Sequence, residues 1–257
     1  MKFNTLIYSP LDQFEILPIL SLNLGFADFT ITNVNVILAL IFFFLTSFYF
    51  LMINIRYFTF SIQLNNWPII FNIIYNLIKD LIINNIGPKG SKFFPLVFSI
   101  FMYVVCLNLI GLIPYSYTIT SHLIVTFALA LFIFIGINII TARYHGFEMF
   151  SLFLPSGTSL ALAFLLVPIE LISYIFKPVS LSIRLFANMM AGHTLLKVIA
   201  GFAYTMMGLS GIIFFVHYVP LLILIPLFLL ELGVSLIQAF VFSVLICIYL
   251  NDAINLH

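Results

Sequence analysis

Long apolar stretches, separated by short polar loops or by turns rich in Gly and Pro, run through the whole sequence. A helix needs about 20 predominantly apolar residues to cross the hydrocarbon core of a bilayer. Three stretches have about this length, and each is followed by a charged residue or a proline, at Arg56, Pro114 and Arg143. The pattern therefore predicts membrane-spanning helices over residues 34–53, 93–113 and 122–140.

Segment 67–84 has a different pattern, because its polar residues recur on one helical face. They stand at offsets of 4, 7, 8 and 12 from the first, namely Asn72, Asn76, Lys79, Asp80 and Asn84. This period is that of an amphipathic helix, and such a helix is typical of the membrane interface. The alternative is a short span whose polar residues face inward.

Two C-terminal stretches, 159–202 and 219–254, are helical in pattern but too long for upright spans. About 40 residues at about 1.5 Å each give roughly 60 Å, about twice the hydrocarbon thickness. We expect the first of them to be steeply tilted, or to break near Pro168 and Pro178. The predicted fold is an all-α membrane protein with a single membrane domain over residues 1–257. It contains an upright N-terminal span, an interfacial amphipathic helix, two further spans and a hairpin of two long tilted helices.

Composition narrows the class of protein. Hydrophobic residues make up 64% of the chain and charged residues 7%, whereas soluble domains carry roughly 25% charged residues. So few charges cannot cover a water-exposed surface, and the surroundings of the chain are expected to be membrane lipid. The formal net charge of +1 offers no electrostatic footprint for a nucleic-acid partner. The sequence has no phosphate-binding loop, so we expect no nucleotide chemistry from this chain by itself.

Basic residues in the loops indicate an orientation. Alternate loops group five of them on one side of the membrane and leave only Lys2 on the other. The five are Arg56, Lys79, Lys89, Lys92 and Arg143. Because basic loops stay on the inner side of a membrane, we expect the N-terminus outside and the C-terminus inside.

Charged and amide side chains within the two long stretches are costly inside a membrane and are therefore candidates for function. Their spacings are mostly multiples of seven, and seven residues return to within about 20° of the same helical face. Each long helix thus carries one polar stripe. The stripes are Glu170, Lys177, Arg184 and Asn188 on the first helix, and Glu231, Ser235, Gln238 and Asp252 on the second.

An antiparallel hairpin would place these groups at different depths. His193 should lie level with Glu231 near the bend, Glu170 should lie level with Asp252 at the open end, and Arg184 should lie between them. Carboxylates and a histidine can relay protons, whereas an arginine stays protonated and acts as a barrier. The pattern favours two separate wet half-paths rather than one pore.

Simpler interpretations exist for single residues. Lys177 and Lys197 are long enough to reach toward the lipid headgroups. Glu170 could pair with a lysine, and Asp252 could be an interfacial anchor near the chain end. Arg184 is the hardest to explain in this way, because it stands too far from either helix end to reach the headgroups easily.

These residues lie within a family resemblance. The run SLSIRLFANMMAGHTLLKVI at 180–199 resembles the signature of subunit a of F-type ATP synthases. The segments at 9–16, 113–122 and 249–257 resemble the mitochondrially encoded form. The resemblance implies that Arg184 is the family's essential arginine, which faces the proton-carrying carboxylate of a rotor ring. It further implies roles for His193 and Glu231 at the inlet half-channel, for Gln238 facing the arginine, and for Asn188, Glu170 and Asp252 in the second half-channel.

The function implied by this resemblance is proton translocation by a stator subunit that supplies two half-channels to the rotor ring. The expected partners are the small two-helix subunits of the ring and the other stator and peripheral-stalk subunits, in the mitochondrial inner membrane. Neither a catalytic residue nor a cofactor is expected. Some algal relatives bind a metal through a second histidine one turn before the His193 position, but Met189 stands there in this chain, so no metal is expected.

Two other classes of protein remain as alternatives. A secondary transporter with a mid-membrane substrate site would be expected to show internal repeats and paired interrupted helices, and the two halves of this chain differ in charge and length. A structural, non-conducting subunit of a respiratory complex would not need aligned polar stripes on two adjacent helices.

Overall fold

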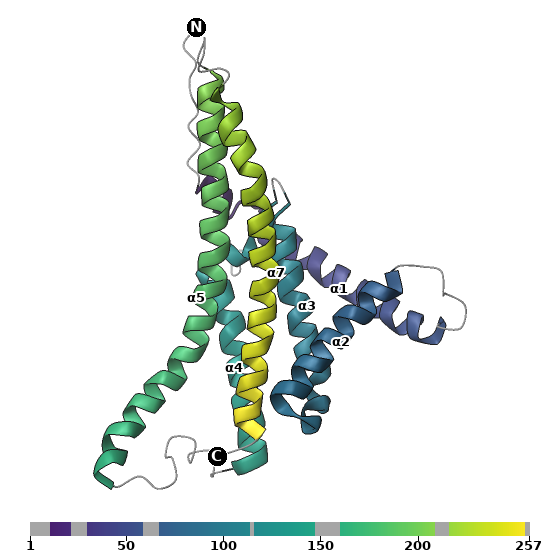
Figure 1. Ribbon diagram of the computed structural model, residues 1–257, viewed down its shortest axis with the longest axis vertical. Coiled ribbons are helices and arrows are strands. Elements are labelled where there is room, and N and C mark those ends of the chain that lie inside the picture. The colour runs from purple at the N-terminus through teal and green to yellow at the C-terminus, as the bar shows by residue number, and fades with distance from the viewer. Residues whose placement is uncertain are drawn as a thin grey trace.

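A computed structural model of the chain describes residues 11–21, 30–58, 67–113, 116–146, 160–208 and 216–254. Almost all of these residues are helical (Figure 1). The α-helices are α1 (Asn33–Phe58), α2 (Trp67–Ile86), α3 (Phe94–Gly111), α4 (Leu123–His145), α5 (Leu160–Met207) and α7 (Tyr218–Ile254). Short 3₁₀ turns are η1 (Asp12–Phe14), η2 (Pro88–Phe93) and η3 (Ile119–Ser121). The predicted all-α membrane fold is confirmed.

Five helical segments are long and apolar enough to cross a membrane within the described part of the chain. They lie at Asn33–Phe50, Gly90–Gly111, Leu123–His145, Phe164–Met207 and Tyr218–Ile254. The amphipathic helix α2 is not among them. Its polar face, which includes Lys79 and Asp80, is exposed, whereas Ile78 and Ile82 on its other face are almost completely buried.

The helix α7 forms the centre of the molecule, because it contacts α2, α3, α4 and α5. Its residues Phe242, Ile246 and Leu250 are at most 1% exposed and lie in one apolar cluster with side chains of α2, α3 and α4. Burial of each such side chain contributes about 1.5–3 kcal/mol of transfer free energy in water, and much less within lipid. A close-packed α7 therefore fixes the positions of the polar side chains that it carries.

The helix α5 is continuous over 48 residues, with Pro168 and Pro178 inside it. Of the two alternatives that its length allowed, a steep tilt or a break at these prolines, the break does not occur, and the N-terminal part of α5 diverges from α4 and α7 (Figure 1). A proline removes one backbone hydrogen bond and pushes against the preceding turn, which permits a bend without ending the helix. The diverging part exposes large apolar side chains, including Phe164 at 87%.

Two short strands, which the sequence pattern did not predict, precede α1. The strand β1 (Pro18–Leu20) pairs antiparallel with β2 (Ile31–Thr32). The backbone N–H of Asn33 donates to the carbonyl of Leu17, and the Asn33 side chain accepts a hydrogen bond from the N–H of Val34. The segment is thereby folded back onto the start of α1.

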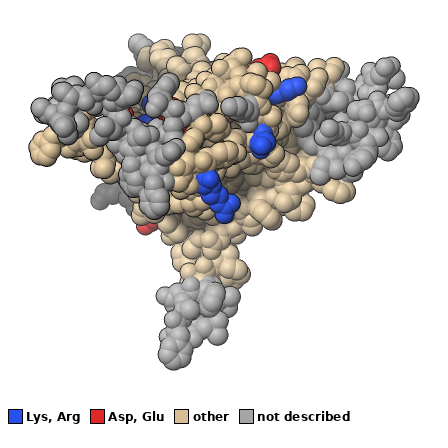
Figure 2. Space-filling model, turned by 90° about the horizontal axis from the view of Figure 1, so that it is seen from below, with Lys and Arg blue, Asp and Glu red and all other residues tan. Residues whose placement is uncertain are grey.

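Lys and Arg side chains gather at one end of the molecule. Figure 2 shows several of them on the face seen from below, together with a few Asp and Glu side chains near its edge. Lys92 stands in the last turn of η2 and Arg143 in the last turn of α4. Both elements lie at the end where α7 finishes (Figure 1).

Candidate functional site

The long helices α5 and α7 run antiparallel and bring His193 and Glu231 together. The distance from His193 Nε2 to Glu231 Oε1 is 3.6 Å, and the side chains are only 13% and 5% exposed. We call these two residues the bend-side pair, because they lie nearer the end of α5 and the start of α7. A histidine and a carboxylate at this separation need only a small movement to exchange a proton.

Gly192 makes room for this pair. A Cβ atom added at Gly192 would lie 2.6 Å from Glu231 Oε1 and 2.9 Å from Glu231 Cδ. The carboxylate of Glu231 therefore lies directly against the backbone of α5, in space that any other residue would fill. A glycine inside a helix costs about 1 kcal/mol relative to alanine. A glycine in the middle of a predicted helix is therefore a signal for close packing. The polar stripes alone do not include Gly192.

Several buried side-chain polar atoms of the described residues have no hydrogen-bond partner, and three of them belong to the bend-side pair. They include His193 Nε2, both carboxylate oxygens of Glu231, Gln238 Nε2, Asn108 Oδ1, Thr118 Oγ1 and Thr120 Oγ1. An unsatisfied buried polar group costs about 1–3 kcal/mol, and proteins normally satisfy such groups with ordered water. The chemistry of this region is thus suited to bound water.

Three of these groups, on Asn108, Thr118 and Thr120, come from outside the long helices. Asn108 on α3 is fully buried and donates from Nδ2 to the carbonyl of Ser235 at 3.1 Å, one turn beyond Glu231. Thr118 lies beside Met189, since both side chains flank the Cβ position of Gly111, and Met189 is one turn before His193. The roles of Asn108 and Thr118 are not evident from the sequence, because their partners lie more than 70 residues away along the chain.

In the middle of the hairpin, Asn188 Nδ2 donates to Gln238 Oε1 at 3.0 Å. Arg184 lies one turn from Asn188 on the exposed face of α5. No Asp or Glu in the described part of the chain lies within ion-pair distance of its guanidinium. A permanent charge thus stands on a membrane helix without a counter-ion among the described residues of its own chain.

Toward the open end of the hairpin, Asp252 meets Lys177 rather than Glu170. The distance from Lys177 Nζ to Asp252 Oδ2 is 3.5 Å, and we call these residues the open-end pair. The sequence predicted that Glu170 would lie level with Asp252. The residue of α5 that meets Asp252 is instead seven positions later in the chain. The N-terminal part of α5, to which Glu170 belongs, diverges from α7 (Figure 1), and Lys177 is the residue of α5 that meets Asp252. Glu170 is half-buried and forms no ion pair with described residues.

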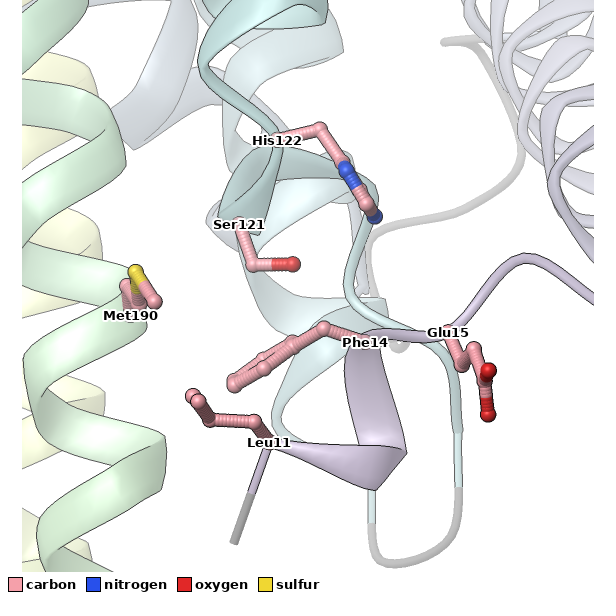
Figure 3. A pocket seen from close by; sticks show the side chains of 6 residues that line it. All are labelled: Leu11, Phe14, Glu15, Ser121, His122 and Met190. Atoms are coloured by element: carbon pink, nitrogen blue, oxygen red, sulfur yellow. The ribbon is translucent and has the colours of Figure 1, made fainter.

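A pocket opens beside α5 at Met190, three residues before His193. It is lined by Leu11, Phe14, Glu15, Ser121, His122 and Met190 (Figure 3). Figure 3 shows Leu11 and Phe14 directed toward Met190 on α5. The His122 ring stacks on Tyr117, with centroids 5.5 Å apart, and is hydrogen-bonded to its hydroxyl. Burial raises the pKa of the Tyr117 phenol.

Metal-ligating side chains do not converge in groups of three or more within the described ranges. Cys106 and Cys247 are both buried and free, and burial among apolar neighbours makes structural thiols inert. The polar groups that α5 and α7 carry form a row along the two helices, and within the described residues they do not converge on one point as metal ligands would.

The fold and the row of polar groups define a polytopic membrane protein with charged side chains along two long adjacent helices. The family described as ATP synthase A chain matches residues 34–251. Subunit a of the ATP synthase of Pylaiella littoralis is 54% identical over 254 residues, covering 97% of this chain and 99% of that protein. Subunit a of Chondrus crispus is 44% identical over 257 residues, with complete coverage of both chains. Subunit a of Marchantia polymorpha is 44% identical over 255 residues, covering 97% and 99%.

This chain belongs to the ATP synthase subunit a family. It is a membrane-sector component of an ATP synthase rather than the part of the complex that carries the catalytic sites. The family resemblance of the segment at 180–199 is thereby confirmed.

Proposed function

We propose that the chain is the proton-translocating stator subunit of a rotary F-type ATP synthase and supplies two half-channels to the rotor ring. The observation that carries this proposal is Arg184, an exposed guanidinium that has no carboxylate partner in the described part of its own chain. A charge in this position is stabilised by a carboxylate from another subunit. Each subunit of a proton-carrying ring would present one such carboxylate.

The outer half-channel would use the bend-side pair. His193 and Glu231 are nearly buried, and their own unpartnered polar atoms are groups that water would satisfy. The pocket at His122 lies beside the same stretch of α5 and gives access from the neighbourhood of η3 (Figure 3). Protons would enter through this water and be relayed by Glu231 and His193 to the ring.

The inner half-channel would use the groups beyond Arg184. Asn188 and Gln238 join α5 to α7 at the level of the arginine. Asp252 and Glu170 are carboxylates nearer the open end of the hairpin, where α5 and α7 diverge (Figure 1). Basic residues at this end (Figure 2) support the assignment of the open end to the inner side, because basic loops are retained there.

The physical cycle follows from these positions. A ring carboxylate accepts a proton from the outer half-channel, becomes neutral and is then cheap to turn toward lipid. After nearly a full rotation it meets the inner half-channel, releases the proton and is held as an anion by Arg184. Because arginine does not release its own proton, it separates the two half-channels and blocks direct leakage.

The partners in this proposal are the small two-helix subunits of the ring and the other stator and peripheral-stalk subunits. The location is the mitochondrial inner membrane, with the N-terminus in the intermembrane space and the C-terminus toward the matrix. Lipid would cover the remaining exposed apolar surface. Neither a cofactor nor a metal is needed for any step.

Cysteine crosslinking tests whether this face of α5 meets the ring. Ala187 lies on the same exposed face as Arg184, whereas Ser182 is 1% exposed on the opposite face. In the assembled complex, Ala187→Cys should form disulfides with a cysteine placed beside the ring carboxylate. Ser182→Cys is the matched control and should not. Absence of any crosslink from Ala187→Cys in an assembled complex would contradict the proposal.

A further inference from the structure

Lys177, to which the proposed function gives no role, lies in a cage of three side chains. Its ammonium is 3.5 Å from Asp252 Oδ2. The same nitrogen is 5.2 Å from the ring centre of Tyr174 and 4.9 Å from that of Tyr249. Both distances are within the range of cation–π interactions. The ammonium is thus bound from both long helices, which differs from a lysine that reaches freely toward headgroups.

The cage is fixed from a third helix. The Tyr174 hydroxyl donates a hydrogen bond to Asn138 Oδ1 on α4. The Tyr174 ring also packs against Phe134, with ring centroids 4.9 Å apart. Three helices therefore determine where the ammonium of Lys177 lies, and through it where the Asp252 carboxylate lies.

The position of the cage is important because it lies between Arg184 and the open end of the hairpin. Lys177 is seven residues before Arg184, which is two turns or about 10 Å along α5. Tyr249 lies close enough to interact electrostatically with both Arg184 and Asp252. Beyond Lys177, α5 diverges from α7 (Figure 1). The open-end pair is thus the last charged contact between the two helices before they separate.

Stability is a weak reason for this arrangement. The side chains of Lys177 and Asp252 are 31% and 41% exposed, and ion pairs this exposed contribute little to folding because water and salt screen them. The geometry instead restricts Asp252, which without Lys177 would be free to turn away from α5.

We propose that Lys177 is a positioning residue of the inner half-channel and acts through Asp252. This inference rests on the proposed function and deepens it. Lys177 holds the Asp252 carboxylate toward α5, where a proton released from the ring would arrive. Asp252 accepts that proton on a carboxylate oxygen and passes it to water on the inner side, while Lys177 keeps its own protons throughout.

The test uses the assembled complex in sealed vesicles and measures ATP-driven proton pumping together with passive proton conductance. Lys177→Met keeps the length of the side chain and removes the charge. We expect pumping to fall about threefold, and no further than in Asp252→Asn, because a misplaced reacting group loses part of its rate. Passive conductance should not rise, since Arg184 is intact. Lys177→Arg should retain most of the pumping, and Lys79→Met, on the exposed face of α2, is the matched control.

A double variant separates positioning from general damage. If Lys177 acts through Asp252, then Lys177→Met combined with Asp252→Asn should pump no more slowly than Asp252→Asn alone. Additive losses, or normal pumping by Lys177→Met, would overturn the inference. Lys177→Gln gives the same comparison if the Met variant does not assemble. Normal pumping by Lys177→Met beside a defective Arg184→Ala would remove this inference and leave the proposed function standing.

Discussion

The bend-side pair and the open-end pair are built from the same two helices in opposite ways. His193 and Glu231 are 13% and 5% exposed, and Glu231 lies against the bare backbone of Gly192. Lys177 and Asp252 are 31% and 41% exposed, and the Lys177 ammonium lies over two aromatic rings. The first pair is nearly buried, with polar atoms that lack hydrogen-bond partners, and the second is more exposed and anchored through its lysine.

This difference teaches how one hairpin can serve two half-channels. An enclosed relay must exchange its proton within the protein, so it depends on close packing and on a few bound waters. An anchored carboxylate near open space needs only to be in the right place. We therefore expect the bend-side pair to be more sensitive to substitution than the open-end pair.

The largest effect is expected from Glu231→Gln, which removes the buried carboxylate and keeps its shape. Proton-driven ATP synthesis should fall by about 100-fold or more, because general acid–base relay typically contributes about 10²–10⁴-fold. Passive conductance should stay low, since Arg184 remains. Flux in reconstituted vesicles is the measurement, with Asp80→Asn on the exposed face of α2 as control. Unchanged synthesis would remove Glu231 from the path.

The second prediction concerns the space beside Glu231. Gly192→Ala would place a methyl group 2.6 Å from the Glu231 carboxylate, so the carboxylate must move and synthesis should fall about tenfold. Gly201→Ala is the matched control, because an added Cβ there meets nothing within 4 Å. That change should be neutral in function and should stabilise α5 slightly. Equal effects of the two alanines would argue against a close packing of Glu231 on α5.

Smaller losses are expected at the open end. Glu170→Gln and Asp252→Asn should each slow ATP-driven pumping severalfold, and the double variant should be little worse than the slower single variant, because members of one path are not additive. Initial pumping rates of the three variants provide the comparison. Fully additive losses would assign the two carboxylates independent roles.

The smallest effect is expected from Thr120→Val, which removes one buried hydroxyl without changing the shape of the side chain. Thr120 is 1% exposed and its Oγ1 has no partner in the described structure. Loss of one water-binding group should slow proton entry only about twofold, because the neighbouring polar groups can still hold a bridging water. The solvent isotope effect on synthesis should change with it. An identical rate and isotope effect would exclude Thr120 from the hydrated region.

Much of the fold was predictable because the lengths of apolar runs alone identify the membrane helices. The antiparallel hairpin also predicted that His193 would lie level with Glu231, since the positions of both residues relative to the bend can be read from the sequence. The pairing of Asp252 with Lys177 was not predictable, because it depends on where α5 diverges. Asn108 and Thr118 were missed for a related reason, as tertiary packing alone brings α3 and η3 to the site.

The orientation of the chain in the membrane is a prediction from the sequence. The roles of the site residues are proposals that rest on the structure. The loop charges, the exposed Arg184 and the enclosed bend-side pair support them from independent directions. The proposed roles of the site residues depend on one central claim, which is that Arg184 separates two half-channels.

Arg184→Ala tests this claim most directly, in an assembled complex reconstituted into sealed vesicles. Pumping and passive proton conductance are measured on the same preparation, with Arg184→Lys beside it. The account predicts that the alanine variant loses ATP-driven pumping and gains a passive leak together. Lysine should also fail to couple, because it lacks the planar guanidinium and can release its proton when desolvated. An assembled Arg184→Ala complex that pumps normally, without a leak, would contradict the account.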